Sequence, residues 1–351
     1  MGILTLFFFN LFIVDAAYSF TSNFYLDSTQ IPENIYNFGL EYRDFSMEGD
    51  FYYFLDIAGS YYRYETNNSV VKPSLGFAKY RNLSKPGDYS EFGLSLSYSF
   101  SQEYPFLYVG PYIGRKVYIR DAVLLKDHLH FNYIWDGDNF YLEVLPGALL
   151  TFELSGFTFV LGEEVGLRGL FMRDMQSSSP ALGHLGNSGA GNNFYLWNFY
   201  FLSNSRTTLR IARNIVDGVG VFYEIAYNLK GPGDLVNESL IAEVNNPLNS
   251  EDFSYNGLSH IIGLNMLISK LFLSLNYRLE SRKYRSIDTS YVEIFRNDKN
   301  SKVTLQGRLP IISSGTELGL TGSFSWTRNS STFEKFTYSE KFYSFGLYFN
   351  F

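Results

Sequence analysis

The sequence predicts an all-β protein: a transmembrane antiparallel up-and-down β-barrel of about 14–16 strands. Three observations lead to this fold class. Apolar residues alternate with polar or small residues at period two, again and again along the chain. Aromatic residues make up 19% of the 351 residues, whereas charged residues make up only 18%. The mean hydropathy of −0.09 is too polar for a protein that crosses a membrane with many helices.

The first element is an apolar run, Ile3–Val14, followed by the small residues Ala16, Ala17 and Ser19. It is shorter than the roughly 20 residues of a membrane-spanning helix. A short apolar run before small residues is typical of a secretory signal peptide, so we predict a leader over residues 1–17. No Lys or Arg precedes the run, which departs from the usual leader and leaves an internal buried strand as the alternative.

The rest of the chain divides into two parts under this interpretation. Residues 18–33 form an N-terminal segment that could plug the barrel, and residues 34–351 form the barrel itself. No domain linker, repeat of solenoid length or strand-to-helix rhythm interrupts the second part.

Period-two alternation is clearest in the segments 89–100, 270–280 and 316–326. In each, one alternate series is apolar, and the residues between are mostly Gly, Ser, Thr or Asn with a few charges. This pattern predicts strands with one apolar and one polar face. The apolar series are Phe92, Leu94, Leu96, Tyr98 and Phe100; Leu271, Leu273, Leu275, Tyr277 and Leu279; and Leu318, Leu320, Phe324 and Trp326.

Further strands are predicted wherever the same alternation recurs. The segment 194–213 has two interpretations, one long strand or a hairpin that turns at 203–205. Residues typical of turns lie at 48–50, 136–139, 268–270 and 313–315, and longer polar connections lie near 171–193, 231–255 and 285–300. The recurring segments are 35–47, 51–63, 70–82, 105–119, 128–135, 139–150, 155–168, 194–213, 217–230, 256–268, 301–311 and 340–351.

The chemistry of the two faces favours a membrane barrel over a soluble sandwich. A sandwich buries its apolar faces and exposes mostly charged residues, and its strands average about 5–6 residues. Here the polar face carries few charges, and the apolar face is long and rich in Tyr, Trp and Phe. Strands of about 9–11 residues with aromatic residues at both ends are typical of transmembrane barrels.

The last eleven residues, KFYSFGLYFNF, place Tyr343, Phe345, Leu347, Phe349 and the terminal Phe351 on one face. This segment resembles the closing strand of bacterial outer-membrane β-barrel proteins. The resemblance implies a location in the bacterial outer membrane, contact with its lipid, and a role for Phe351 as the signal read by the barrel-assembly machinery. Porins are similar in architecture. Fatty-acid transporter barrels are similar in length, but their amino-terminal Asn-Pro-Ala hatch motif is absent here.

Composition excludes several classes of site. A net charge of −7 argues against a nucleic-acid partner, which needs a basic face. The chain has no cysteine, so it has no disulfide, thiolate metal site or cysteine nucleophile. His128 and His130 share one face of a predicted strand, but two ligands do not make a metal site. We therefore predict no metal and no cofactor.

The inner face of the barrel should carry the function, because outward positions are constrained to be apolar. Acids and bases are mixed on it, which favours pairing between them over a selectivity filter of one sign. Thirteen charged residues are assigned to this face by parity: Glu41, Arg43, Asp56, Glu91, Glu143, Glu164, Arg168, Arg210, Glu224, Arg278, Glu280, Arg308 and Glu317.

The sequence predicts a passive channel for small solutes, because a barrel of about 16 strands is too wide for its own side chains to fill. One alternative is a lipid hydrolase that uses His184 and Ser188, in a segment loosely similar to the catalytic stretch of outer-membrane phospholipase A. That stretch has its serine two residues after the histidine, whereas Ser188 follows His184 by four. A surface-exposed adhesin or structural barrel is the other alternative. The sequence predicts neither a substrate nor an oligomeric state.

Overall fold

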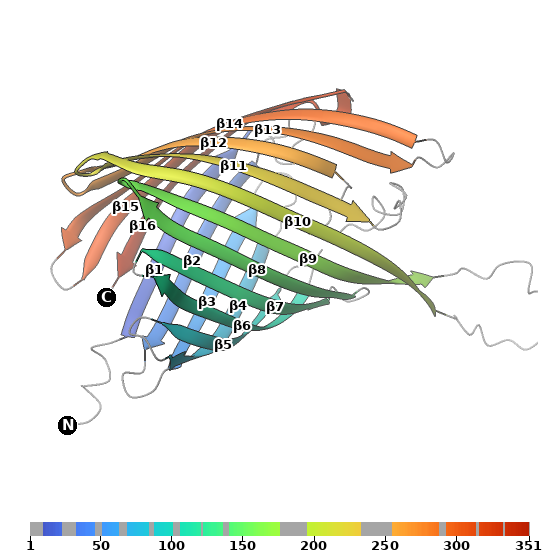
Figure 1. Ribbon diagram of the computed structural model, residues 1–351, viewed down its shortest axis with the longest axis horizontal. Helices are drawn as coiled ribbons and strands as arrows, with labels where there is room; N and C mark the ends of the chain where they lie inside the picture. Colours follow the sequence, from blue (N-terminus) through green and yellow to red (C-terminus); the bar gives the residue numbers. More distant parts are fainter. Residues whose placement is uncertain are drawn as a thin grey trace, which may run out of the picture.

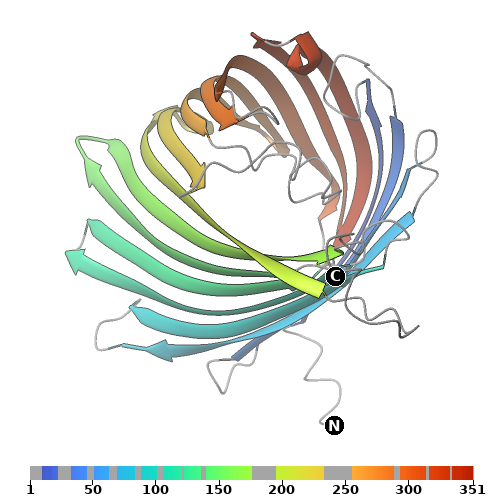
Figure 2. The ribbon, with the colours of Figure 1, turned by 90° about the vertical axis from the view of Figure 1, so that its right-hand side faces the viewer.

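The protein is a closed barrel of antiparallel strands in which each strand pairs with its neighbours in sequence, and the first pairs with the last. The computed structural model describes residues 10–22, 33–45, 51–62, 69–83, 88–100, 106–120, 122–135, 140–175, 195–232, 255–287, 293–313, 316–332 and 334–350. These residues contain sixteen strands, so the predicted fold class and strand number are confirmed. Figure 2 shows the strands curving around a common axis. No helix in the described ranges is long and apolar enough to cross a membrane.

The strands follow one another up and down the barrel wall, as Figure 1 shows. Most are longer than the roughly 9–11 residues that span a bilayer. Their bounds are β1 Asn10–Thr21, β2 Glu33–Phe45, β3 Phe51–Tyr62, β4 Ser69–Asn82, β5 Tyr89–Ser99, β6 Phe106–Arg120, β7 Val123–Trp135, β8 Phe140–Leu154, β9 Phe157–Met175, β10 Tyr195–Val216, β11 Val219–Pro232, β12 Tyr255–Ile268, β13 Leu271–Ile287, β14 Glu293–Ser313, β15 Glu317–Ser331 and β16 Tyr338–Asn350.

Closure of the barrel depends on β1, which the sequence analysis does not predict. β1 pairs with β2 from Asn10 to Thr21 and with β16 from Ile13 to Thr21. These residues overlap both the expected leader over 1–17 and the expected plug over 18–33. In the structure, Asn10–Thr21 lie in the barrel wall, as in the buried-strand alternative. The leader over residues 1–17 and the plug over residues 18–33 stay predictions.

Two side-chain environments distinguish the faces of the wall. On one alternate series, polar residues are buried, as in Ser259 at 2% and Glu280 at 4% exposure. On the other, large apolar residues are exposed, as in Ile262 at 59% and Phe345 at 65%. Side chains crowd together on the concave side of a closed sheet and diverge on the convex side. The polar series is thus the inner face and the apolar series the outer face.

The outer face is not wholly apolar, contrary to expectation. Arg115 and Asp127 lie opposite each other on β6 and β7, on the same series as the exposed Ile113, and form an ion pair of 2.5 Å. Two strands further along the same row, Glu163 accepts a hydrogen bond of 2.5 Å from Thr207. These four polar residues form a patch on the outer face.

In two places the strand limits need comparison with those predicted from the alternation of apolar and polar residues. Within the segment 194–213, residues 195–213 belong to one strand, β10, so the structure has the long strand and not the hairpin. The connection expected at 285–300 is mostly strand, since β13 ends at Ile287 and β14 begins at Glu293. These strand ends carry polar residues on both faces. The alternation of apolar and polar residues therefore does not predict them. The turn predicted at 268–270 is confirmed, with Ser269 at a φ of 56°.

Glycines on the inner face make room for large side chains from neighbouring strands. A Cβ at Gly93 would overlap the ring of Tyr112, and one at Gly147 would overlap the imidazole of His128. Gly263 relates in the same way to Phe222, and Gly319 to Tyr348. Each of these rings lies over a glycine of the neighbouring strand, in the space that a side chain at that position would fill.

Candidate functional site: the inner wall of the barrel

The register places the predicted charged residues on the polar inner series of their strands. Glu41 lies opposite Asp56, Arg168 opposite Glu143, and Arg210 opposite Glu224. The side chains of Arg43 and Asp56 lie outside the described part of the chain. The remaining eleven residues do not form one ring of like charge. Most of those with a described contact form an ion pair with a nearby residue of opposite charge.

One polar network lies on β6 to β9. Glu143 is 7% exposed and accepts hydrogen bonds from Arg168 at 2.9 Å and from the amide of Asn132 at 3.0 Å. Asn132 in turn accepts a hydrogen bond of 2.8 Å from the Tyr108 hydroxyl. Each buried polar group thus has a partner, which offsets the cost of removing it from water.

A second network lies on β13. The Glu280 side chain is 1% exposed and pairs with Arg278 at 2.7 Å and with Arg282 at 3.0 Å. These residues share one face because they are two apart on a strand. Arg282 also lies 5.1 Å from the ring of Tyr255. Two guanidinium groups therefore surround one buried carboxylate.

The same wall continues onto β14. Arg296 pairs with Asp298 at 3.3 Å. Its guanidinium lies between two aromatic rings, 3.7 Å from Tyr284 and 3.8 Å from Phe336. The cation is thus held by ring faces as well as by an acid.

A third cluster joins the last three strands. Glu317 accepts hydrogen bonds from Arg308 at 3.0 Å and from the Tyr348 hydroxyl at 2.5 Å. The guanidinium of Arg308 lies 4.1 Å from the Tyr348 ring. These contacts tie β14, β15 and β16 together near the strand that closes against β1.

The two histidines of β7 lie on the inner face with their ring centres 5.0 Å apart. His130 stacks on Tyr112 at 5.1 Å, and His128 lies 3.9 Å from the carboxylate of Glu164. In the described ranges, no group of three or more His, Cys, Asp or Glu residues could hold a metal ion. The stack of His130 on Tyr112 joins β7 to β6 on the inner face of the wall.

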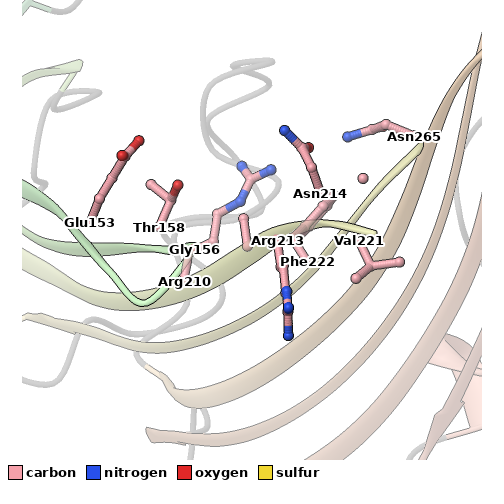
Figure 3. Close-up of a pocket in the computed structure, with 11 residues that line it drawn as sticks. Glu153, Gly156, Thr158, Arg210, Arg213, Asn214, Val221, Phe222 and Asn265 are labelled. Atoms are coloured by element: carbon pink, nitrogen blue, oxygen red, sulfur yellow. The ribbon is translucent and has the colours of Figure 1, made fainter. Parts of the chain in front are cut away.

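A pocket of about 290 Å³ lies on the inner wall beside the turns that join β8 to β9 and β10 to β11. Figure 3 shows Glu153, Thr158, Arg210 and Asn214 pointing to the same side of the sheet. The Arg210 guanidinium lies 3.8 Å from the ring of Phe222. Arg213 also borders the pocket, but its side chain points to the other side of the sheet. The side chains on the pocket side therefore combine one cation, Arg210, one acid, Glu153, and neutral hydrogen-bonding groups.

Several residues of these clusters are absent from the sequence prediction. Arg206, Arg282, Arg296 and Asp298 lie on the same series as predicted neighbours, and Arg206 pairs with Glu224 at 3.4 Å. Their parity could have revealed them, had the strand limits of β10, β13 and β14 been known. The amide of Asn132 gives no such signal, because an uncharged residue on a polar face is common.

Other expectations fall outside the described residues. These are the hydrolase pair His184 and Ser188, the terminal Phe351, and most of the connections at 171–193 and 231–255. Their chemistry stays a prediction.

Similarity to known proteins lies in the fold. No protein-family model matches the chain, and no curated protein matches its sequence. Among solved structures, a bacterial polysaccharide outer membrane secretin is similar with a TM-score of 0.53 and 6% identity, over 97% of this chain and 98% of that chain. OccAB1 of Acinetobacter baumannii is similar with a TM-score of 0.51 and 9% identity, over 97% and 96%.

The fold is that of a bacterial outer-membrane β-barrel. Proteins of this architecture reside in the outer membrane, which agrees with the location expected from the sequence. The exposed apolar outer face is then the lipid-facing surface of the barrel, and its inner face lines the lumen.

Proposed function

We propose that this outer-membrane barrel is a channel through which small polar solutes diffuse passively. The observation that supports it best is the combination of barrel size with a polar inner wall. Barrels of 16 strands are wide enough for an aqueous channel, whereas barrels of about 8 strands are filled by their side chains. Here large inner side chains such as Tyr112 and His128 lie over glycines of the neighbouring strands. A wall lined by polar side chains is compatible with water and ions in the lumen.

Single-channel recording in a planar bilayer tests this proposal. Purified protein, folded in detergent, should give stable conductance steps in KCl, and protein heated to unfolding should give none. A folded, heat-modifiable protein that adds no conductance would contradict the channel and favour a plugged or structural barrel.

A charge reversal distinguishes conduction through the barrel from leakage around it. Lys302 lies on the inner series of β14, and Lys299 lies on the outer series of the same strand. We expect Lys302→Glu to shift the reversal potential in a KCl gradient toward cation selectivity, because its charge faces the permeating ions. The matched variant Lys299→Glu should leave the reversal potential unchanged. Equal shifts in both variants would show that the current does not cross the lumen.

A further inference from the structure

We propose that the pocket beside Arg210 binds the carboxylate group of small hydroxycarboxylates or aminocarboxylates. The site lies on the inner wall near the short turns. Its role in transport, as a binding site for solutes that cross the channel, rests on the proposed channel function. The binding itself does not require conduction.

Arg210 is held by a stack of three layers. The ring of Phe222 lies over Gly263, where a Cβ would overlap it, and so rests against the wall. The Arg210 guanidinium lies over that ring at 3.8 Å. A cation over a ring face keeps its plane parallel to the surface and leaves the N–H groups at its edge directed elsewhere. The guanidinium is thus oriented before any ligand arrives.

Arg210 has no acidic partner among the described residues. Glu224 lies directly opposite it in the register, yet pairs with Arg206 at 3.4 Å. A guanidinium without an acidic partner matches a planar carboxylate, which it can bind with two parallel hydrogen bonds. This geometry favours a carboxylate over a halide or another spherical anion.

The other groups of the pocket narrow the class of ligand. Thr158, Asn214 and Asn265 are neutral and can donate and accept hydrogen bonds. Glu153 is the only acid that lines the pocket in the described part of the chain. It would accept a hydrogen bond from a hydroxyl or ammonium group and would repel a second negative charge. A small monocarboxylate with such donors fits best.

The same strand supplies a matched control. Arg213 lies three residues from Arg210 and also borders the pocket. Its side chain, however, points to the opposite side of the sheet in Figure 3. It also lies over an aromatic ring, that of Phe157, at 4.7 Å. The two arginines therefore share residue type, strand and aromatic support, and differ in the face on which they lie.

Isothermal titration of the folded protein in detergent tests the site directly. Gluconate is the probe, and sorbitol, a neutral polyol of equal carbon number, is the control ligand. We expect saturable binding of gluconate and none of sorbitol. Arg210→Gln should weaken gluconate binding at least about 10-fold, the scale of a lost charged hydrogen bond. Arg213→Gln should bind as the unmodified protein does.

Heat modifiability on a gel shows whether Arg210→Gln folds. If it does not fold, two further variants test the site. Arg210→Lys keeps the charge but loses the paired donors, so binding should weaken while remaining measurable. Phe222→Leu removes the ring support and should weaken binding about threefold. Equal binding of gluconate and sorbitol, or equal effects at positions 210 and 213, would overturn the proposal. Conductance without gluconate binding would refute the site alone, and binding without conductance would refute the channel alone.

Discussion

At the scale of single residues, small and large side chains complement each other across neighbouring strands of the inner wall. Tyr112, His128 and Phe222 each occupy the space above a glycine on the next strand. A side chain at the glycine would displace the ring toward the barrel axis. The width of the lumen therefore depends on residues that carry no chemistry of their own.

Replacing one such glycine should strain the wall. In Gly147→Ala, the new methyl group overlaps the imidazole of His128, so we expect a loss of about 1–3 kcal/mol in the free energy of unfolding, as for other overpacked sites. Gly162→Ala is the matched control on the adjacent strand, because its Cβ would meet Leu149 at an ordinary 3.7 Å. Urea unfolding in detergent measures both. Equal stability of the two variants would show that the His128 ring moves aside freely.

At the scale of the strand, alternation decides which surroundings a side chain meets. Leu305 on β14 faces outward and is 43% exposed, while the adjacent Gln306 faces inward. A shift of one residue in the register would exchange these surroundings. The same rule explains why Arg278, Glu280 and Arg282 meet one another.

Arginine placed on the two faces of β14 should have opposite effects. Leu305→Arg sets a charge against lipid, where the cost near the middle of the bilayer is about 2–4 kcal/mol. Gln306→Arg directs the same side chain into the lumen, where water and acids can surround it. The fraction of protein that folds into lipid vesicles, read from heat-modified gel mobility, should fall for Leu305→Arg alone. The reverse order would mean that the assigned faces are exchanged.

The outward ion pair on β6 and β7 tests whether charges in the apolar band depend on each other. Asp127→Ala leaves Arg115 without its acid on the lipid side, so folding into vesicles should become less efficient. The double variant Arg115→Leu, Asp127→Leu removes both charges and should fold at least as well as the unmodified protein, because lipid-facing leucines suit the band. A double variant that folds worse than Asp127→Ala would contradict this account and indicate a partner for the polar patch.

At the scale of the whole molecule, the fold depends on closure of the barrel by pairing of the first and last strands. Among the described residues, each strand pairs with two neighbours because β1 joins β16, so the sheet has no open edge strand. A barrel that lacked β1 would expose the edges of β2 and β16.

Deletion of residues 1–17 distinguishes a barrel strand from a leader. The deletion removes Asn10–Ala17, most of β1, so we expect the shortened protein to lose heat-modified mobility on refolding. A matched deletion of residues 1–9, which precede β1, should refold as the full chain does. If the deletion of 1–17 refolds normally, or if the chain isolated from outer membranes begins near residue 18, the segment is a leader and the register of β1 is wrong.

The sequence by itself determined the fold class, the approximate strand number and the parity of the charged residues, because a β-strand repeats every two residues and lipid demands one apolar face. It left the apolar run at Ile3–Val14 open between a leader and a buried strand, since a short apolar run before small residues is common to both. Only the tertiary structure decided which charges meet. The pairing of Arg206 with Glu224, which leaves Arg210 over Phe222, depends on the register between β10 and β11. Register is a relation between two paired strands, and here it also depends on the irregularity between Asn214 and Val216 beside the turn, which the alternation along either strand does not define.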